Sequence, residues 1–202
     1  MKELIKKRHL IPIAVWFVIY MGLFGFLEIV PPKEVHLIHC ALDDMIPHMA
    51  VFIYPYVSWF PYIVVCAYLA IKNLDDRQFK KAVLVLTTGM NIFLFISFVW
   101  PTGLNLREGI VYDLHTLSGN LLKFVQTVDT PKSVFPSMHV YVLEMQKKLV
   151  PSWGIWVGRV LAVLIVLSTM FTKQHSVLDV SAAIVMFAVL VVMVEKIVKN
   201  KE

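Results

Sequence analysis

The sequence predicts an all-α integral membrane protein, with six transmembrane helices in one bundle and both termini in the cytoplasm. Of the 202 residues, 58% are hydrophobic and only 16% are charged, whereas soluble domains carry about 25% charged residues. The apolar residues gather in stretches long enough to cross a bilayer, which takes about 20 residues per helix. The length and the lack of any low-complexity linker favour one membrane domain over residues 1–202.

Five apolar stretches are long enough to be spans. The first follows the basic segment MKELIKKRHL, and because it is as long as a full span and no cleavage site follows, we expect a retained helix rather than a signal peptide. The second contains three prolines, which a spanning helix tolerates where neighbouring helices satisfy the freed carbonyl groups. The five stretches are approximately residues 10–30, 45–71, 82–100, 153–171 and 177–194.

Residues 136–150 are the sixth candidate span and the shortest. A helix of about 14 residues covers only about 21 Å, and this segment contains a glutamate, a glutamine and two lysines. Charge favours counting it as a span. With six spans and a cytoplasmic N-terminus, thirteen Lys and Arg residues lie inside and five outside, with Arg159 within a span, which fits the positive-inside rule. The segments 31–44, 101–136 and 172–176 then fall on the outer face.

The net charge of +5 is also compatible with nucleic-acid binding, but the basic residues lie beside apolar runs rather than along one soluble face. We therefore expect no nucleic-acid partner, and expect the bilayer to surround the protein. Four outer-face residues leave open a metal site, and with it a metal transporter, although they match no complete ligand pattern. They are His39, Asp43, Asp44 and His48. The alternative is that one of the two aspartates caps the second span.

His175 and Asp179 lie four residues apart at the start of the last span, in the sequence TKQHSVLDV. This spacing places both side chains on one face of a helix. A carboxylate there fixes the tautomer of the imidazole and makes its other nitrogen a better nucleophile or base. The alternative is a structural ion pair that holds the helix end, and the pair alone leaves both interpretations open.

The segment VFPSMHVY places Ser137 and His139 at the start of a further helix. Ser137 can cap that helix, and the first N–H groups of a helix attract anions. His139 is then a candidate acid for a departing oxygen, while the alternative is a helix cap followed by an interfacial histidine. Together the two segments predict phosphoryl transfer without a metal, in which His175 attacks phosphorus and His139 protonates the leaving alkoxide.

These segments resemble the second and third motifs of the type 2 phosphatidic acid phosphatase superfamily, typically Pro-Ser-Gly-His and Ser-Arg-x5-His-x3-Asp. The stretches VDTPKSVFPSMHV, STMFTKQHSVLDV and DDMIPHMAVFIYPYVSW are closer to its inositol phosphorylceramide synthase-like branch. The likeness covers about residues 43–190. It implies a six-helix core and an extracytoplasmic active site with Ser137 as phosphate ligand, His139 as acid, His175 as nucleophile and Asp179 as its orienting partner.

The sequence departs from the family pattern mainly in its cations. The first motif, Lys-x6-Arg-Pro, is absent around Pro101, and Thr169 stands where the third motif has arginine. Met138 replaces the glycine of the second motif, and its backbone N–H remains a candidate phosphate ligand. Three basic residues are the candidates to hold the phosphate: Arg107, Lys132 and Lys173.

We therefore expect an integral membrane lipid phosphatase that hydrolyses a phospholipid or another lipid phosphate through phosphohistidine at His175, with no metal or other cofactor. A lipid or polyol hydroxyl in place of water as acceptor would make the protein a phosphotransferase, like the synthases of the related branch. A third hypothesis is a catalytically inactive relative that binds a lipid. We expect an active site on the extracytoplasmic face, of the cell membrane in a prokaryote.

Overall fold

The computed structural model describes residues 10–30, 34–132, 135–137 and 152–199, without the side chains of residues 152–155. This part of the chain is mostly helical and has seven α-helices, one 3-10 helix and a two-stranded sheet. The predicted helical class is therefore confirmed, and four helical segments are long and apolar enough to cross a membrane. The short predicted span at residues 136–150 lies almost wholly outside the described residues.

The four segments correspond to predicted spans. They are α2 (Leu10–Ile29), the 3-10 helix η1 (Ala50–Phe52) continued by α4 (Ile53–Asn73), α5 (Asp76–Val99) and α8 (Val177–Lys199). A fifth helix, α7 (Ser152–Phe171), covers another predicted span, and its described apolar part, Trp156–Phe171, is shorter than the other four segments.

Two of these helices begin at residues other than those predicted, for local reasons. The second predicted span starts at η1 rather than at residue 45, because Ile46 precedes Pro47 and is extended (φ −80°, ψ 117°), as residues before proline tend to be. The helix α5 starts before residue 82, because the side chain of Asp75 accepts a hydrogen bond from the N–H of Gln78 at 2.7 Å. A carboxylate in this position caps a helix.

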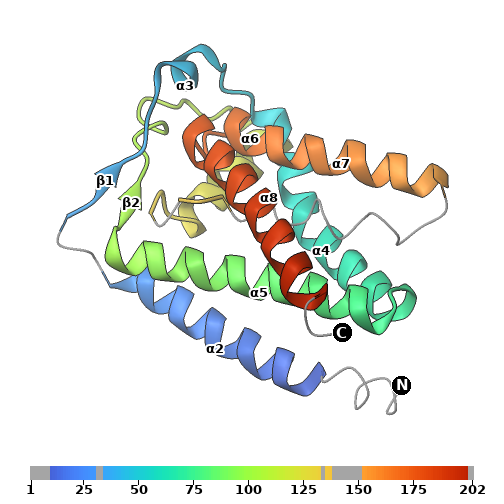
Figure 1. Ribbon diagram of the computed structural model, residues 1–202. Helices are drawn as coiled ribbons and strands as arrows, with labels where there is room; N and C mark the ends of the chain where they lie inside the picture. The colour runs from blue at the N-terminus through green and yellow to red at the C-terminus, as the bar shows by residue number, and fades with distance from the viewer. Residues whose placement is uncertain (1–9, 31–33, 133–134, 138–151, 200–202) are drawn as a thin grey trace.

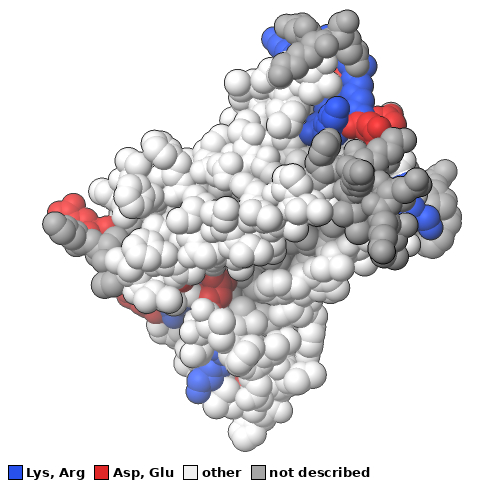
Figure 2. All heavy atoms as spheres, turned by 90° about the horizontal axis from the view of Figure 1, so that it is seen from below, with Lys and Arg blue, Asp and Glu red and all other residues white. Residues whose placement is uncertain are grey.

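The long helices pack in pairs. The helix α8 crosses α5, α4 packs against α7, and α2 lies along α5 (Figure 1). Large apolar side chains such as Val18, Val64 and Phe98 remain about 70% exposed, and Figure 2 shows a wide uncharged area between small charged patches. Water rarely meets so much apolar surface on a soluble protein, whereas bilayer hydrocarbon solvates it.

The polar connections gather at one end of the bundle. A parallel pair of short strands, β1 (His36–Leu37) and β2 (Thr102–Gly103), lies there with the helices α3 (Ala41–Met45) and α6 (Leu117–Val128). In Figure 1 the strands lie at the left and α3 at the top, whereas α2 begins and α8 ends towards the lower right. The strand pair joins two of the segments that were predicted to share one face of the membrane.

The turn into α6 predicts a steric test. The N–H of Gly119 donates to Oγ1 of Thr116 at 3.1 Å, and a Cβ at this glycine would lie 2.0 Å from the carbonyl oxygen of Asp113. Gly119→Ala is therefore expected to lower the free energy of unfolding by about 1–3 kcal/mol, as overpacking does, in denaturant titrations in detergent. Gly22→Ala is the control, because nothing lies within 4 Å of a Cβ there, and no loss of stability is expected. A fully stable Gly119→Ala variant would contradict the described turn.

Candidate functional site

The structure brings His175 and Asp179 together at the start of α8. Nδ1 of His175 lies 2.8 Å from Oδ2 of Asp179. Asp179 is completely buried, and His175 is 9% exposed. A carboxylate in this position takes the N–H of Nδ1 and so makes Nε2 the ring nitrogen that carries the lone pair in the neutral tautomer. A nitrogen of this kind can act as a nucleophile or as a base.

The turn between α7 and α8, which carries His175, is polar and yet buried. The N–H groups of Gln174 and His175 both donate to the carbonyl of Thr169, at 2.8 and 3.0 Å. Lys173 adopts the left-handed conformation (φ 56°), which commonly terminates a helix. Three members of the turn are at most 2% exposed: Thr172, Gln174 and Ser176.

Asp43, one residue of the proposed metal group, instead holds the start of α8. Its Oδ1 accepts from the N–H of Val177 at 2.8 Å, and its Oδ2 accepts from Oγ of Ser176 at 2.6 Å and from the N–H of Cys40 at 2.8 Å. The carboxylate is 2% exposed. It therefore satisfies N–H groups that would otherwise lie unpaired at the helix N-terminus, where a negative charge is also favourable.

Lys173, in the turn before α8, also binds the segment that contains Asp43. Its ammonium donates to the backbone carbonyls of Asp43 and Ile46, both at 2.6 Å. The side chain is 8% exposed, and no carboxylate of the described residues forms an ion pair with it. Its charge reaches His48, whose pKa is lowered by burial and then by Lys173. The predicted phosphate-binding lysine therefore places a positive charge beside the His175 turn.

Arg107 approaches the same turn from the loop between α5 and α6. Its Nε donates to the carbonyl of Lys173 at 3.3 Å, Nη1 donates to the carbonyl of Asp129 at 2.6 Å, and Nη2 donates to Oε1 of Gln174. Burial lowers the pKa of Arg107, and the charge of Asp129 opposes this effect. Because all three guanidinium nitrogens already donate within the protein, Arg107 anchors the turn and adds positive charge near it.

Ser137 connects the second predicted motif to the same helix start. Its backbone N–H donates to the carbonyl of Asp179 at 3.2 Å, and the residue is completely buried. Two segments that are far apart in the sequence therefore meet at the His175–Asp179 pair. The other two predicted residues of this motif, Met138 and His139, lie outside the described residues, and their roles remain predictions.

Three buried polar atoms around the pair have no hydrogen-bond partner among the residues that the structure describes. They are Oγ of Ser137, Nε2 of Gln174 and Oδ1 of Asp179. A buried polar group without a partner is destabilising. Such atoms close to an aspartate–histidine pair are consistent with a site in which a polar ligand or water completes the hydrogen bonds.

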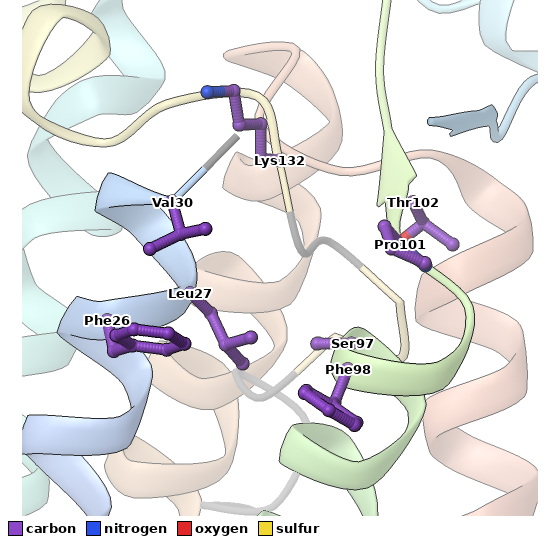
Figure 3. Close-up of a pocket in the computed structure, with 8 residues that line it drawn as sticks. All are labelled: Phe26, Leu27, Val30, Ser97, Phe98, Pro101, Thr102 and Lys132. Carbon is purple, nitrogen blue, oxygen red and sulfur yellow. The ribbon is translucent and has the colours of Figure 1, made fainter. Parts of the chain in front are cut away.

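Lys132, the third predicted phosphate-binding cation, has different surroundings from Lys173 and Arg107. It forms an antiparallel bridge with Gly103 and lines a cavity of about 150 Å³ between α2 and α5. Figure 3 shows Phe26 and Leu27 of α2 opposite Phe98 of α5, with Lys132 at the upper end. No described contact joins this lysine to the His175–Asp179 pair, so its role in phosphate binding remains a prediction.

The four residues of the proposed metal site do not converge. Nε2 of His39 pairs with Oδ1 of Asp44 at 2.9 Å on the surface, while Asp43 faces α8. In the part of the chain that the structure describes, no group of three or more His, Cys, Asp or Glu side chains is arranged to hold a metal ion.

The sequence interpretation did not identify two residues that the structure places in the site. The sequence offers Asp43 as a metal ligand or, as one of two neighbouring aspartates, as a cap of the second span, and nothing local distinguishes it from Asp44. Gln174 was not singled out, although a polar residue directly before His175 at the start of an apolar span was a usable signal.

Comparison with known proteins adds no relative, because no protein-family model, curated protein or solved structure matches the chain.

The contacts of Asp43 predict a specific loss of stability. Asp43→Asn removes the charge and one acceptor oxygen, so the free energy of unfolding is expected to fall by about 1.5–3 kcal/mol, as for hydrogen bonds to charged groups. Asp44→Asn is the matched control, because that side chain is 66% exposed and surface changes usually cost less than about 0.5 kcal/mol. Denaturant titrations in detergent measure both, and equal losses would contradict the assignment.

The same variant predicts the sign of a pH dependence. Burial alone would raise the pKa of Asp43, but hydrogen bonds from Ser176, Val177 and Cys40 outweigh it, and the pKa lies below its ordinary value of 3.8. A folded-state pKa below the unfolded value contributes stability that is present above pH 3.8 and is lost as the pH falls through the folded pKa. The stability difference between the native protein and Asp43→Asn should therefore shrink below pH 3.8.

Proposed function

We propose that the protein is an integral membrane phosphoric ester hydrolase that acts on lipid phosphates, with His175 as the nucleophile. The observation that carries the proposal is the buried carboxylate of Asp179, 2.8 Å from Nδ1 of His175, with the backbone of Ser137 bound to the same aspartate. A helix cap alone does not require an imidazole held by a buried acid beside a second polar segment.

In the first half-reaction Nε2 of His175 attacks phosphorus, and the bond between phosphorus and the ester oxygen breaks. The phosphoryl group is then covalently bound to Nε2, and the leaving alkoxide takes a proton from His139 and departs as an alcohol. Asp179 keeps the proton of Nδ1 in place and stabilises the positive ring. His139 is assigned this role from the sequence alone.

In the second half-reaction water attacks the phosphorus of phosphohistidine. His139, now neutral, takes a proton from the water, the nitrogen–phosphorus bond breaks, and its electron pair returns to His175. Inorganic phosphate leaves and both histidines regain their starting states. Transfer to the hydroxyl of a lipid or polyol would follow the same steps, and this is the alternative reaction, a phosphotransferase.

The charges around the turn support an anionic substrate. Lys173 is 8% exposed, and its ammonium donates only to neutral carbonyls among the described residues. Arg107 adds a second positive charge at the turn, where its Nε donates to the carbonyl of Lys173. Buried charges that lack a counterion are destabilising, so a phosphoryl group bound here would offset this cost and gain from both charges.

We infer six spans with both termini in the cytoplasm, and a site on the extracytoplasmic face. The four long apolar segments and α7 account for five spans, and residues 136–150 supply the sixth. The bias of thirteen inner against five outer basic residues supports this orientation. Catalysis at the outer face gives the site access to lipids of the outer leaflet.

Cysteine labelling tests the orientation. Val111, in the α5–α6 loop, is 89% exposed, and Lys80, near the start of α5, is also exposed. In a background with Cys40→Ser and Cys66→Ser, Val111→Cys is expected to react with a membrane-impermeant maleimide on intact cells. Lys80→Cys should react only after the membrane is permeabilised. The reverse pattern would place the His175 turn on the cytoplasmic side.

Phosphate release tests the chemistry. Purified native protein in detergent with EDTA is expected to release phosphate from short-chain phosphatidic acid, and His175→Ala should reduce the rate by about 1,000-fold or more, because the nucleophile is lost. His115→Ala is the control, since this exposed loop histidine lies outside the proposed chemistry. Equal rates in the native protein and His175→Ala would refute the nucleophile.

A native protein that releases no phosphate needs a second measurement. Transfer of a labelled head group to a lipid or polyol acceptor, again lost in His175→Ala, would establish the phosphotransferase. Absence of both activities, together with retained lipid binding, would identify an inactive lipid-binding relative.

A further inference from the structure

Gln174 has an unusual environment for a buried glutamine. It directly precedes His175 and is 2% exposed. Its Oε1 accepts a hydrogen bond from Nη2 of Arg107, but its amide nitrogen Nε2 is buried and has no hydrogen-bond partner in the part of the chain that the structure describes. One end of the amide is therefore held firmly, while the end that donates two hydrogen bonds is left unused.

Arg107 determines which end of the amide is left unused. A guanidinium group has donors only, so the side-chain oxygen of Gln174 must face it and the NH₂ group must point away. The guanidinium is itself held by the carbonyls of Lys173 and Asp129, at 3.3 and 2.6 Å. This arrangement fixes the orientation of the Gln174 amide before any ligand binds.

A second glutamine shows what a purely structural role looks like in this network. Nε2 of Gln126 donates to the carbonyl of Thr172 at 2.8 Å, and its Oε1 accepts from the hydroxyl of Tyr112 at 2.5 Å. Both ends of the Gln126 amide are satisfied, as is usual for buried polar groups. Gln174 differs only at its donor end, next to the proposed nucleophile.

The cations of the site have few N–H groups left for a ligand. Each guanidinium nitrogen of Arg107 already donates within the protein, and Lys173 donates twice to backbone carbonyls. Two further donors near the pair, the Gln174 amide nitrogen and the hydroxyl of Ser137, are buried and have no hydrogen-bond partner among the described residues. A phosphoryl oxygen is an acceptor that fits such donors.

We propose that Gln174 forms a phosphoryl-oxygen subsite, in which Nε2 donates to an oxygen of the phosphoryl group while Arg107 holds the amide in place. The ligand class is a tetrahedral oxyanion, either free phosphate or the phosphate of a lipid. The identity of the lipid substrate rests on the proposed function, whereas binding of the oxyanion does not. Lys173 and Arg107 contribute charge, and Gln174 contributes a directed hydrogen bond.

Equilibrium binding of orthovanadate, a phosphate analogue, tests the subsite without any turnover. The assay uses purified full-length protein in detergent without a chelator, because EDTA binds vanadate, and titrates vanadate against protein stability or heat of binding. Gln174→Glu keeps an acceptor for Arg107 and the side-chain shape but loses the donor. We expect vanadate affinity to fall at least tenfold, with an unfolding temperature that is unchanged or higher because Arg107 gains an ionic partner.

Two further variants separate hydrogen bonding from charge. Gln174→Met removes the donor without adding a charge, and vanadate binding should again fall at least tenfold. Gln78→Glu makes the same charge change near the start of α5, outside the site, and affinity should stay within twofold of native. Native-like vanadate affinity in Gln174→Met would overturn the subsite, as would the absence of vanadate and orthophosphate binding by the native protein.

Competition distinguishes the two sources of phosphate. Displacement of vanadate by short-chain phosphatidic acid would support a lipid phosphate at Gln174, and failure to displace it would overturn the lipid assignment. The proposed hydrolysis fails on different data, namely absence of phosphate release and of phosphohistidine in the native protein. Vanadate binding that depends on Gln174 would stand in that case.

Discussion

The requirement that a buried charge find partners governs the polar end of this bundle. The carboxylate of Asp43 has almost no exposed surface, and the start of α8 supplies its donors through Ser176 and Val177. Lys173 has the opposite requirement, and the backbone carbonyls of Asp43 and Ile46 accept from it. Each segment thus supplies neutral hydrogen-bond partners to the charged side chain of the other, and burying either without them would be unfavourable. His175 lies between the two contacts, so its position follows from them.

A second set of contacts, made by other parts of the chain, holds the same turn. Arg107 and Gln126 come from the loop after α5 and from α6, and between them they bind the carbonyls of Thr172 and Lys173 and the side chain of Gln174. The turn is therefore fixed by its neighbours as well as by its own backbone hydrogen bonds. Catalysis by fixed dipoles and charges requires this kind of support, because groups that are already oriented need not reorganise during the reaction.

The elements that the sequence predicted well are those that depend on local patterns. Hydropathy locates the long helices because each must present apolar side chains over a bilayer thickness. The four-residue spacing of His175 and Asp179 predicts that the two side chains meet, and they do, although His175 lies in the turn before α8 rather than on the helix. The contacts of Asp43 have no such local signal, since Asp44 has the same chemistry and only the tertiary arrangement buries one of them. Gln174 was missed for a related reason, because an unused amide donor becomes visible only when its surroundings are known.

The hydrogen bonds that join Asp43 of α3 to the start of α8 also have a consequence for biosynthesis. The hydrogen bond between Ser176 and Asp43 joins residues that are 133 positions apart in the chain. The ribosome synthesises Asp43 long before Ser176. The carboxylate of Asp43 therefore lacks these donors while the intervening helices enter the membrane. The site can therefore assemble only when α8 is inserted. A chain that stops before this last helix lacks Asp179, the partner of the proposed nucleophile, and the N–H of Val177 that Asp43 accepts from. Insertion of α8 is therefore the step that completes both the fold and the site.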